Sequence, residues 1–398
     1  MKMKQTTFLA IALIVIMLSI SACSGTAGPA GPAGPAGPAG PAGEAGEAGS
    51  TSAVRGNEWA GKEACADCHE GIYDSFMLSG HPYKLNKVVD GQAPTYPFTE
   101  ITVLPEGYTW DEISYVIGGY NWKARFVDLD GYIITGDEDA TTQYNFYNEE
   151  LDLGDSWVGY HAGEENVPYN CGVCHTSGYQ PEGNQDDLPG MVGTWEETGI
   201  TCEECHGPSS LHVENPTAFT PQIVRDSDLC GECHIRGDIT MVDASGGFIK
   251  HHEQYEELFQ SKHIVVDCVV CHDPHGGVIQ YREAGVQAVN TACENCHFVE
   301  AKYAAVEMHT PAYVTCETCH MPKVSKSALG DAERYRGDIM THIMAIDSDV
   351  IGQFTEDGAY SKSQISLDFA CRQCHNGIDH SVKTDEELLE AAADYHTP

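Results

Sequence analysis

One long apolar run interrupts an otherwise mixed pattern of hydrophobic and polar positions. Phe8 to Ile20 is apolar apart from one serine and follows two lysines, Lys2 and Lys4, which is the pattern of a signal peptide. The run leads into Ile20-Ser-Ala-Cys23, which matches a lipobox, so we expect residues 1–22 to be removed and Cys23 to be lipidated. No second apolar stretch approaches the roughly 20 residues that a membrane span needs.

A segment of low complexity follows. Gly28 to Ala42 consists of five Gly-Pro-Ala triplets, and two Gly-Glu-Ala triplets continue the register. Glycine at every third position is the collagen pattern, but the run is short for a stable triple helix. We therefore favour a stiff polyproline-type tether, which at about 3.1 Å per residue would extend roughly 70 Å. Residues 23–57 are predicted to form the lipid anchor and this tether.

Beyond the tether, the pattern predicts a few regular elements. Trp122 to Leu129 and Tyr132 to Thr135 flank Asp130-Gly131, which is a strong signal for a β-hairpin. The aromatic residues around Tyr144 indicate another extended segment, so we expect a small β-hairpin subdomain near residues 95–160. Thr384 to Tyr395 predicts an amphipathic helix whose first turn carries carboxylates, as the helix dipole favours.

The cysteines supply the chemistry. Of the 17 cysteines, 16 fall into eight copies of Cys-x-x-Cys-His, which is the attachment pattern of c-type haem. The two thiols form thioethers with the vinyl groups of one haem, and the adjacent imidazole becomes the proximal iron ligand. The sixteen cysteines are Cys65, Cys68, Cys171, Cys174, Cys202, Cys205, Cys230, Cys233, Cys268, Cys271, Cys293, Cys296, Cys316, Cys319, Cys371 and Cys374; the proximal histidines are His69, His175, His206, His234, His272, His297, His320 and His375.

Other uses of paired cysteines explain the pattern less well. Zinc sites, redox pairs or a disulfide framework do not need a histidine after every second cysteine. The seventeenth cysteine is Cys23, so eight haems and one lipid anchor account for every thiol. We therefore expect eight covalently bound c-type haems. Since no copy ends in lysine, the lysine-ligated active haem of pentahaem nitrite reductases has no counterpart here.

Eleven further histidines can supply the sixth ligands. His275 lies only three residues after His272, a reach of roughly 10 Å, so it cannot pass around the macrocycle and must serve a neighbouring haem. The same argument applies to His212. Of the adjacent His251 and His252, we expect one to be a ligand. The distal candidates are His81, His212, His251, His252, His263, His275, His309 and His342; we expect surface positions for His161, His380 and His396.

The charge restricts the partners and lowers the haem potentials. With 60 acidic and 21 basic residues the net charge is −39, which excludes nucleic acid as a partner. One negative charge about 10 Å from an iron stabilises the ferric state by roughly 1.7 kcal/mol at a dielectric constant near 20, or about 70 mV. The same charge also keeps an exported protein soluble.

Several stretches resemble extracellular and outer-membrane multihaem c-type cytochromes of metal-reducing and electron-exporting microbes. They are His81-Pro-Tyr-Lys-Leu, Tyr115 to Arg125, Cys202 to His212, His251 to Tyr255 and Cys268 to His275. The resemblance implies electron transfer across or beyond the cell envelope, with His81, His212, His263 and His275 as sixth ligands of other haems. Some relatives polymerise into filaments, which is a further alternative.

We expect a multihaem cytochrome c fold: mostly irregular chain with short α-helices wrapped around haems, plus the hairpin subdomain. Residues 58–170 would hold the first haem and the β-rich part, and 171–398 the other seven haems and the C-terminal helix. The leading function is an exported, lipid-anchored electron carrier at the outer membrane or cell surface, whose partners are other redox cytochromes or extracellular acceptors, including metal oxides. The membrane is contacted through the lipid anchor only.

An enzyme is the alternative function. Octahaem oxidoreductases acting on hydroxylamine, nitrite or tetrathionate share the haem count and export, but need one iron with an open position. The sequence alters no motif and has spare histidines, so it singles out no open site.

The haem count is directly measurable. The pyridine haemochrome assay on the purified protein should give eight haems per chain, because each motif supplies both thioethers and a proximal ligand. A count well below eight would contradict this assignment.

Overall fold

The computed structural model describes residues 56–251, 253–303, 309, 314–393 and 395–396. The predicted signal peptide, Cys23, the tether up to residue 55 and the distal candidate His252 lie outside the described residues. Residues 56–398 form one compact unit. Among the residues described, no helix is long and apolar enough to cross a membrane. The division at residue 170 stays a prediction.

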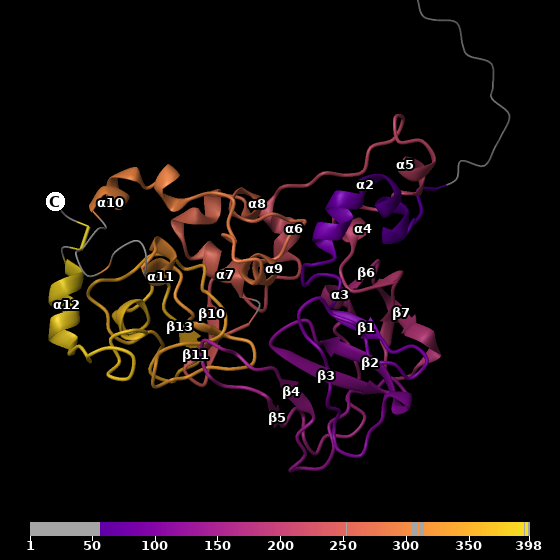
Figure 1. Ribbon diagram of the computed structural model, residues 1–398, viewed down its shortest axis with the longest axis horizontal. Coiled ribbons are helices and arrows are strands. Elements are labelled where there is room, and N and C mark those ends of the chain that lie inside the picture. Colours follow the sequence, from indigo (N-terminus) through magenta and orange to yellow (C-terminus); the bar gives the residue numbers. More distant parts are fainter. Residues whose placement is uncertain (1–55, 252, 304–308, 310–313, 394, 397–398) are drawn as a thin grey trace, which may run out of the picture. The chain divides into compact units, whose positions relative to one another are not determined.

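A five-stranded antiparallel sheet organises the residues between the first two Cys-x-x-Cys-His motifs (Figure 1). Its order is β1-β2-β3-β4-β5, and the strands are Leu85–Lys87, Ile113–Gly118, Lys123–Asp128, Gln143–Asn145 and Ser156–Val158. The sheet therefore begins earlier than the predicted β-rich region near 95–160. Strands β2 and β3 form its longest pairing, and Gly118 and Gly119 at their connection adopt positive φ angles of 75° and 96°.

The reversal predicted at Asp130-Gly131 is present, but its return arm is short. The Asp128 amide donates to the Tyr132 carbonyl at 2.8 Å, and Gly131 has a φ of 86°, which suits a residue without Cβ. Only one bridge, Val127 to Ile133, pairs the two arms. The extended segment expected around Tyr144 is strand β4.

Both faces of the five-stranded sheet are buried. On one face, Val116 and Phe126 pack in a cluster with Tyr96. On the other face, Tyr115 packs in a cluster with Trp195, which lies beyond the second motif. The sheet is thus the core of its region and holds the segments that flank the first motifs.

A second sheet, which the sequence did not predict, lies within the haem-dense region. Strands Val242–Ser245 (β10), Phe248–Lys250 (β11), Ser325–Lys326 (β12) and Tyr360–Ser361 (β13) pair in the order β12-β11-β10-β13. Strands β11 and β12 are parallel, and Ile249 pairs with Ser325. Two further pairs are β6-β9 and β7-β8, formed by Thr176–Ser177, Glu197–Thr198, Gln180–Asn184 and Val192–Thr194.

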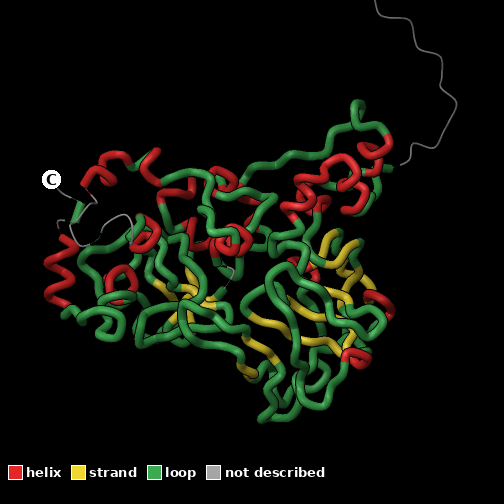
Figure 2. Tube along the Cα trace, in the orientation of Figure 1, coloured by secondary structure: helices red, strands yellow, loops and turns green. Residues whose placement is uncertain are grey.

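The helices are mostly single turns, and Figure 2 shows loops along most of the trace. They are α2 Lys62–Phe76, α3 Gly172–His175, α4 Cys202–His206, α5 Ser210–Glu214, α6 Ser227–Gly231, α7 Gln254–Phe259, α8 Cys268–Cys271, α9 Val278–Glu283, α10 Phe298–Tyr303, α11 Cys316–His320 and α12 Asp385–Ala393. The predicted C-terminal helix is α12. Thr384 caps it, because its hydroxyl accepts from the Glu387 amide while Glu387 accepts from the Thr384 amide.

Candidate haem sites

Each Cys-x-x-Cys-His motif lies in or beside a helical turn. Helices α2, α4 and α11 each contain a whole motif. Part of a motif lies in each of α3, α6 and α8, in the 3₁₀ turn at Cys293–Asn295 and in the π turn at Asp368–Arg372. One helical turn brings positions i, i+3 and i+4 to the same face, so both thiols and the imidazole serve one side. We number the sites 1 to 8 by their motif histidines, which are His69, His175, His206, His234, His272, His297, His320 and His375.

In seven of these sites, a second histidine ring faces the motif histidine. An iron bound by two imidazoles, with metal–nitrogen bonds of about 2 Å, separates the ring centroids by roughly 6 Å. The pairs, with their centroid distances, are His69–His212 (6.4 Å), His206–His275 (6.1 Å), His234–His81 (6.2 Å), His272–His342 (6.0 Å), His297–His263 (5.6 Å), His320–His396 (5.9 Å) and His375–His309 (6.0 Å). This spacing fits a ligated iron.

The facing histidines come from other parts of the chain. His212 follows site 3 closely but faces site 1, and His275 follows site 5 but faces site 3. His81 follows site 1 and faces site 4. This agrees with the argument from reach, which placed such residues beside a neighbouring haem.

Three histidines were expected at the surface. His161 contacts Glu164 at 2.9 Å and faces no motif histidine within the described residues. His396 is exposed, as expected, but its ring faces that of His320. The prediction of a surface position therefore overlooked His396 as a candidate ligand. His380 lies 6.1 Å from His375, which makes it a second neighbour of site 8 beside His309. No spacing signal in the sequence distinguishes His396 from an ordinary surface histidine.

The Nδ1 atoms of many of these imidazoles are already engaged. Those of His206, His212 and His320 lie 2.7–2.8 Å from the backbone carbonyls of Gln222, Phe219 and Met344. An Nδ1–H that donates to a carbonyl leaves Nε2 unprotonated, which is the tautomer that iron binds. In site 6 the two Nε2 atoms of His297 and His263 lie 3.4 Å apart. The donor set therefore fits c-type haem.

Comparisons with known proteins agree with this geometry. Residues 149–207 match the family model "Cytochrome c554 and c-prime". The dissimilatory sulfite reductase MccA of Wolinella succinogenes is 22% identical, and the match covers 67% of this chain and 51% of that protein, so the chain spans about half the length of its curated relative. The solved structure of this octahaem sulfite reductase, form II, aligns with a TM-score of 0.56 at 16% identity and covers 84% of this chain and 71% of that one.

The outer cell wall cytochrome OcwA aligns with a TM-score of 0.50 at 18% identity, covering 84% of this chain and 86% of that one. At these identities the alignments establish the fold, which is that of multihaem cytochromes. The chain is a multihaem c-type cytochrome. It carries covalently bound c-type haems.

Cysteine side chains of different sites of the cytochrome lie against one another. Thiol–thiol contacts join site 1 to 3, site 2 to 4, site 4 to 5 and site 6 to 7, through the pairs Cys65–Cys202, Cys174–Cys233, Cys230–Cys268 and Cys293–Cys316. Electrostatic interactions of cysteines join site 3 to 4, site 5 to 6 and site 7 to 8, through Cys205–Cys230, Cys271–Cys296 and Cys319–Cys371. Because thioethers would fix the porphyrin edges, these cysteine contacts give the order in which the motifs neighbour one another. The order is 1-3-4-5-6-7-8, with site 2 beside site 4.

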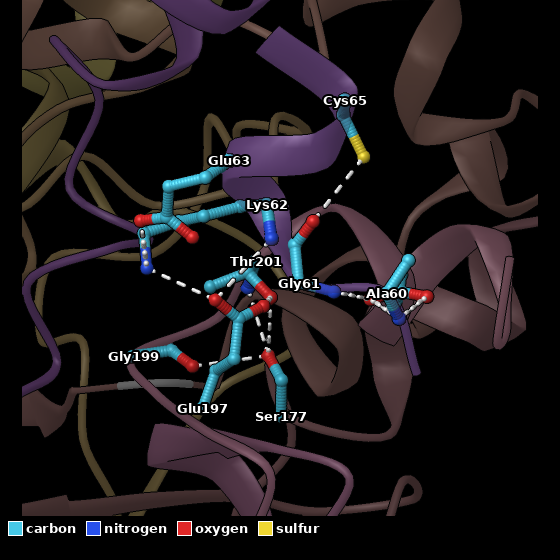
Figure 3. Close-up of polar contacts among 10 residues, drawn as sticks. Ala60, Gly61, Lys62, Glu63, Cys65, Ser177, Glu197, Gly199 and Thr201 are labelled. Atoms are coloured by element: carbon cyan, nitrogen blue, oxygen red, sulfur yellow. Dashed lines mark hydrogen bonds and ion pairs between the residues drawn. The ribbon is translucent and has the colours of Figure 1, made fainter. Parts of the chain in front are cut away.

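A polar network holds the first three sites together (Figure 3). Glu197 accepts hydrogen bonds from the Lys62 ammonium at 3.0 Å and the Thr201 hydroxyl at 2.7 Å. The Thr201 amide donates to the Ser177 hydroxyl at 2.8 Å, and the latter donates to the Gly199 carbonyl at 3.0 Å. Lys62 begins the helix of site 1, Thr201 precedes site 3, and Ser177 follows site 2. The network therefore fixes the spacing of three sites.

Site 2 differs from the others. Within the described part of the chain, no second histidine ring faces His175 at a distance near 6 Å, although His251 interacts with it electrostatically. His175 interacts instead with the charges of Lys84, Lys123 and Arg125: burial and these three cations together lower its pKa to about 3. None of the three has a carboxylate within 4 Å among the described residues. In a chain of net charge −39, this is a concentration of partly buried basic side chains.

Burial sets the charge state of these cations. It lowers the pKa of Lys123 to about 7, and the charge of Arg125 adds to the shift. Burial also lowers the pKa of Lys84. Arg125 lies 3.5 Å from the centre of the Tyr160 ring and donates to Gln143 at 2.7 Å. No local pattern in the sequence indicates this cluster, because Lys84 lies far along the chain from strand β3, which carries both Lys123 and Arg125.

Glu203 in helix α4 offers a test of how the chain holds these sites. Its buried carboxylate accepts from the amides of Ala60, Gly61 and Ser209 at 2.8–2.9 Å. Glu203→Ala should lower the free energy of unfolding by about 3 kcal/mol, since it leaves one buried and two partly buried amides without acceptors. Urea unfolding measures the loss.

The neighbouring Glu204 is the matched control, because it accepts one amide bond, from Gly178 at 2.9 Å. Glu204→Ala should cost about 1 kcal/mol. Equal losses in the two variants would contradict the role assigned to Glu203.

Proposed function

We propose that this cytochrome carries eight haems and conducts electrons along them between redox partners. The observation that carries the proposal is the set of seven facing histidine pairs, since two axial imidazoles hold an iron six-coordinate and suit it to electron transfer rather than to substrate binding. We assign His212, His275, His81, His342, His263, His396 and His309 as the sixth ligands of sites 1, 3, 4, 5, 6, 7 and 8, respectively. The proposed route is the order of sites given above.

The cytochrome is further proposed to be exported and anchored through Cys23 at the outer membrane or cell surface. The tether would hold the haem domain away from the membrane, and OcwA, which shares the fold, is named as an outer cell wall cytochrome. The proposed partners are other redox cytochromes or extracellular acceptors such as metal oxides. The negative charge of the chain favours positively charged partner surfaces.

The proposed electron route along the eight haems, which we call the conduit, makes a spectroscopic prediction. In the resting ferric protein, electron paramagnetic resonance should assign seven haems to low-spin iron, because seven sites have a second imidazole. The reduced protein should be fully reoxidised by a soluble ferric chelate. Cys23→Ala should move the protein out of the membrane fraction and leave this reoxidation unchanged. High-spin iron at several sites, or haems that stay reduced, would contradict the proposal.

A second candidate function, reduction of a small oxyanion at site 2, is favoured by the buried cations. Lys84, Lys123 and Arg125 would bind and orient the anion at site 2, where the haem would supply the electrons. The curated relative is named as a dissimilatory sulfite reductase, so sulfite is the first anion to test. Its reduction to hydrogen sulfide and three waters takes six electrons and eight protons. The other sites would then deliver electrons to site 2 through site 4.

Sulfite titration tests this second candidate. Sulfite should perturb one high-spin ferric signal, and its affinity should fall as pH rises through about 7, because Lys123 then loses its charge. Lys123→Gln should weaken binding at least about tenfold at pH 6, since a charge-assisted hydrogen bond contributes about 1.5–3 kcal/mol. The half-exposed Lys87, paired with Asp186, is the control, and Lys87→Gln should have no effect. The absence of any signal that responds to sulfite would exclude sulfite as a ligand of site 2.

A further inference from the structure

A buried carboxylate stands beside one of the facing histidines. Glu257 lies in helix α7, and its side chain is 2% exposed. Among the described residues, no lysine or arginine lies within ion-pair distance of it; the basic group nearest its carboxylate is the imidazole of His342. Such a charge is costly to bury unless other groups compensate for it.

The contacts of Glu257 connect it to site 5. Its Oε2 atom accepts from the His342 backbone amide at 2.5 Å and lies 3.7 Å from Nδ1 of the same residue. Its Oε1 atom accepts from the Ser325 hydroxyl at 2.8 Å. The ring of His342 in turn faces His272, the motif histidine of site 5, at 6.0 Å. Glu257 therefore fixes the backbone of this histidine and presents a carboxylate oxygen to its outer nitrogen.

No other facing histidine in the described residues has such a neighbour. The Nδ1 atoms of His234, His263 and His309 meet neutral oxygens, from an amide and two hydroxyls. Two further carboxylates lie near ring nitrogens, Asp273 at 3.9 Å from His275 and Glu300 at 4.0 Å from His297. Both are exposed, at 37% and 55%, so solvent and salt screen their charges.

We propose that Glu257 is a positioning residue that makes site 5 a low-potential step in the electron route. A buried negative charge beside an axial imidazole stabilises ferric over ferrous iron, and the low dielectric around it preserves the effect. The inference rests on the proposed conduit and adds to it. Site 5 lies between sites 4 and 6 in the route, so electrons that pass between the two halves of the chain must cross an energetically uphill step there.

Glu257→Gln tests the inference in the full-length, haem-loaded protein. Glutamine keeps the size of the side chain and an acceptor for the amide of His342 but removes the charge. A redox titration followed by optical spectroscopy should show one haem component moving to higher potential and seven staying in place. Glu300→Gln is the matched control, because it removes an exposed carboxylate at a similar distance from a ring nitrogen, and it should shift no component measurably.

The outcomes separate this inference from the conduit itself. If Glu257→Gln keeps eight haems and its low-spin signals but no component moves, or if Glu300→Gln produces an equal shift, the role of Glu257 is refuted and the conduit stands. If low-spin iron is absent at site 5 in the unmodified protein, the conduit fails first.

A second variant covers the case in which Glu257→Gln does not load its haems. In the protein that carries His342→Ala alone, the redox titration should lack one low-spin component. The inference requires the missing component to be the one with the lowest potential among the eight. A missing component of intermediate or high potential would overturn it.

Discussion

The structure depends on pairs of imidazoles that face one another across the width of one iron. Each pair joins a motif to a histidine from a distant segment, as in His69 with His212 and His81 with His234. In a chain with little regular secondary structure, these pairs are cross-links between segments. Ligation of iron is therefore also a folding interaction, because the ligands of a metal site come together only in the folded chain.

The two sheets and the polar networks perform the remaining structural work. The five-stranded sheet buries both of its faces and so provides a rigid support beside sites 1 to 3. Buried carboxylates such as Glu203 hold backbone amides where regular hydrogen bonding is absent. Charge then differentiates the sites: Lys84, Lys123 and Arg125 lie near site 2, whereas Glu257 stands beside site 5. A uniform set of motifs thus becomes a set of electrostatically distinct sites.

Local features were predictable from the sequence, and long-range ones were not. The spacing of cysteines identified every motif, Asp130-Gly131 marked a real reversal, and the carboxylates after Thr384 marked a real helix. The parallel pairing of Ile249 with Ser325 left no local signal, because the partners lie far apart and their strands are short. Reach alone predicted that His275 serves another site but could not name that site. The cluster of Lys84, Lys123 and Arg125 also left no local signal, because Lys84 lies far along the chain from the other two.

The most direct test of the central claim is a crystal structure of the haem-loaded protein. The account predicts eight haems in contact in the order of sites 1-3-4-5-6-7-8, with the haem of site 2 beside that of site 4. It also predicts an imidazole on both faces of the irons of sites 1, 3, 4, 5, 6, 7 and 8. A haem isolated from all the others, or several irons ligated on one face only, would contradict the account.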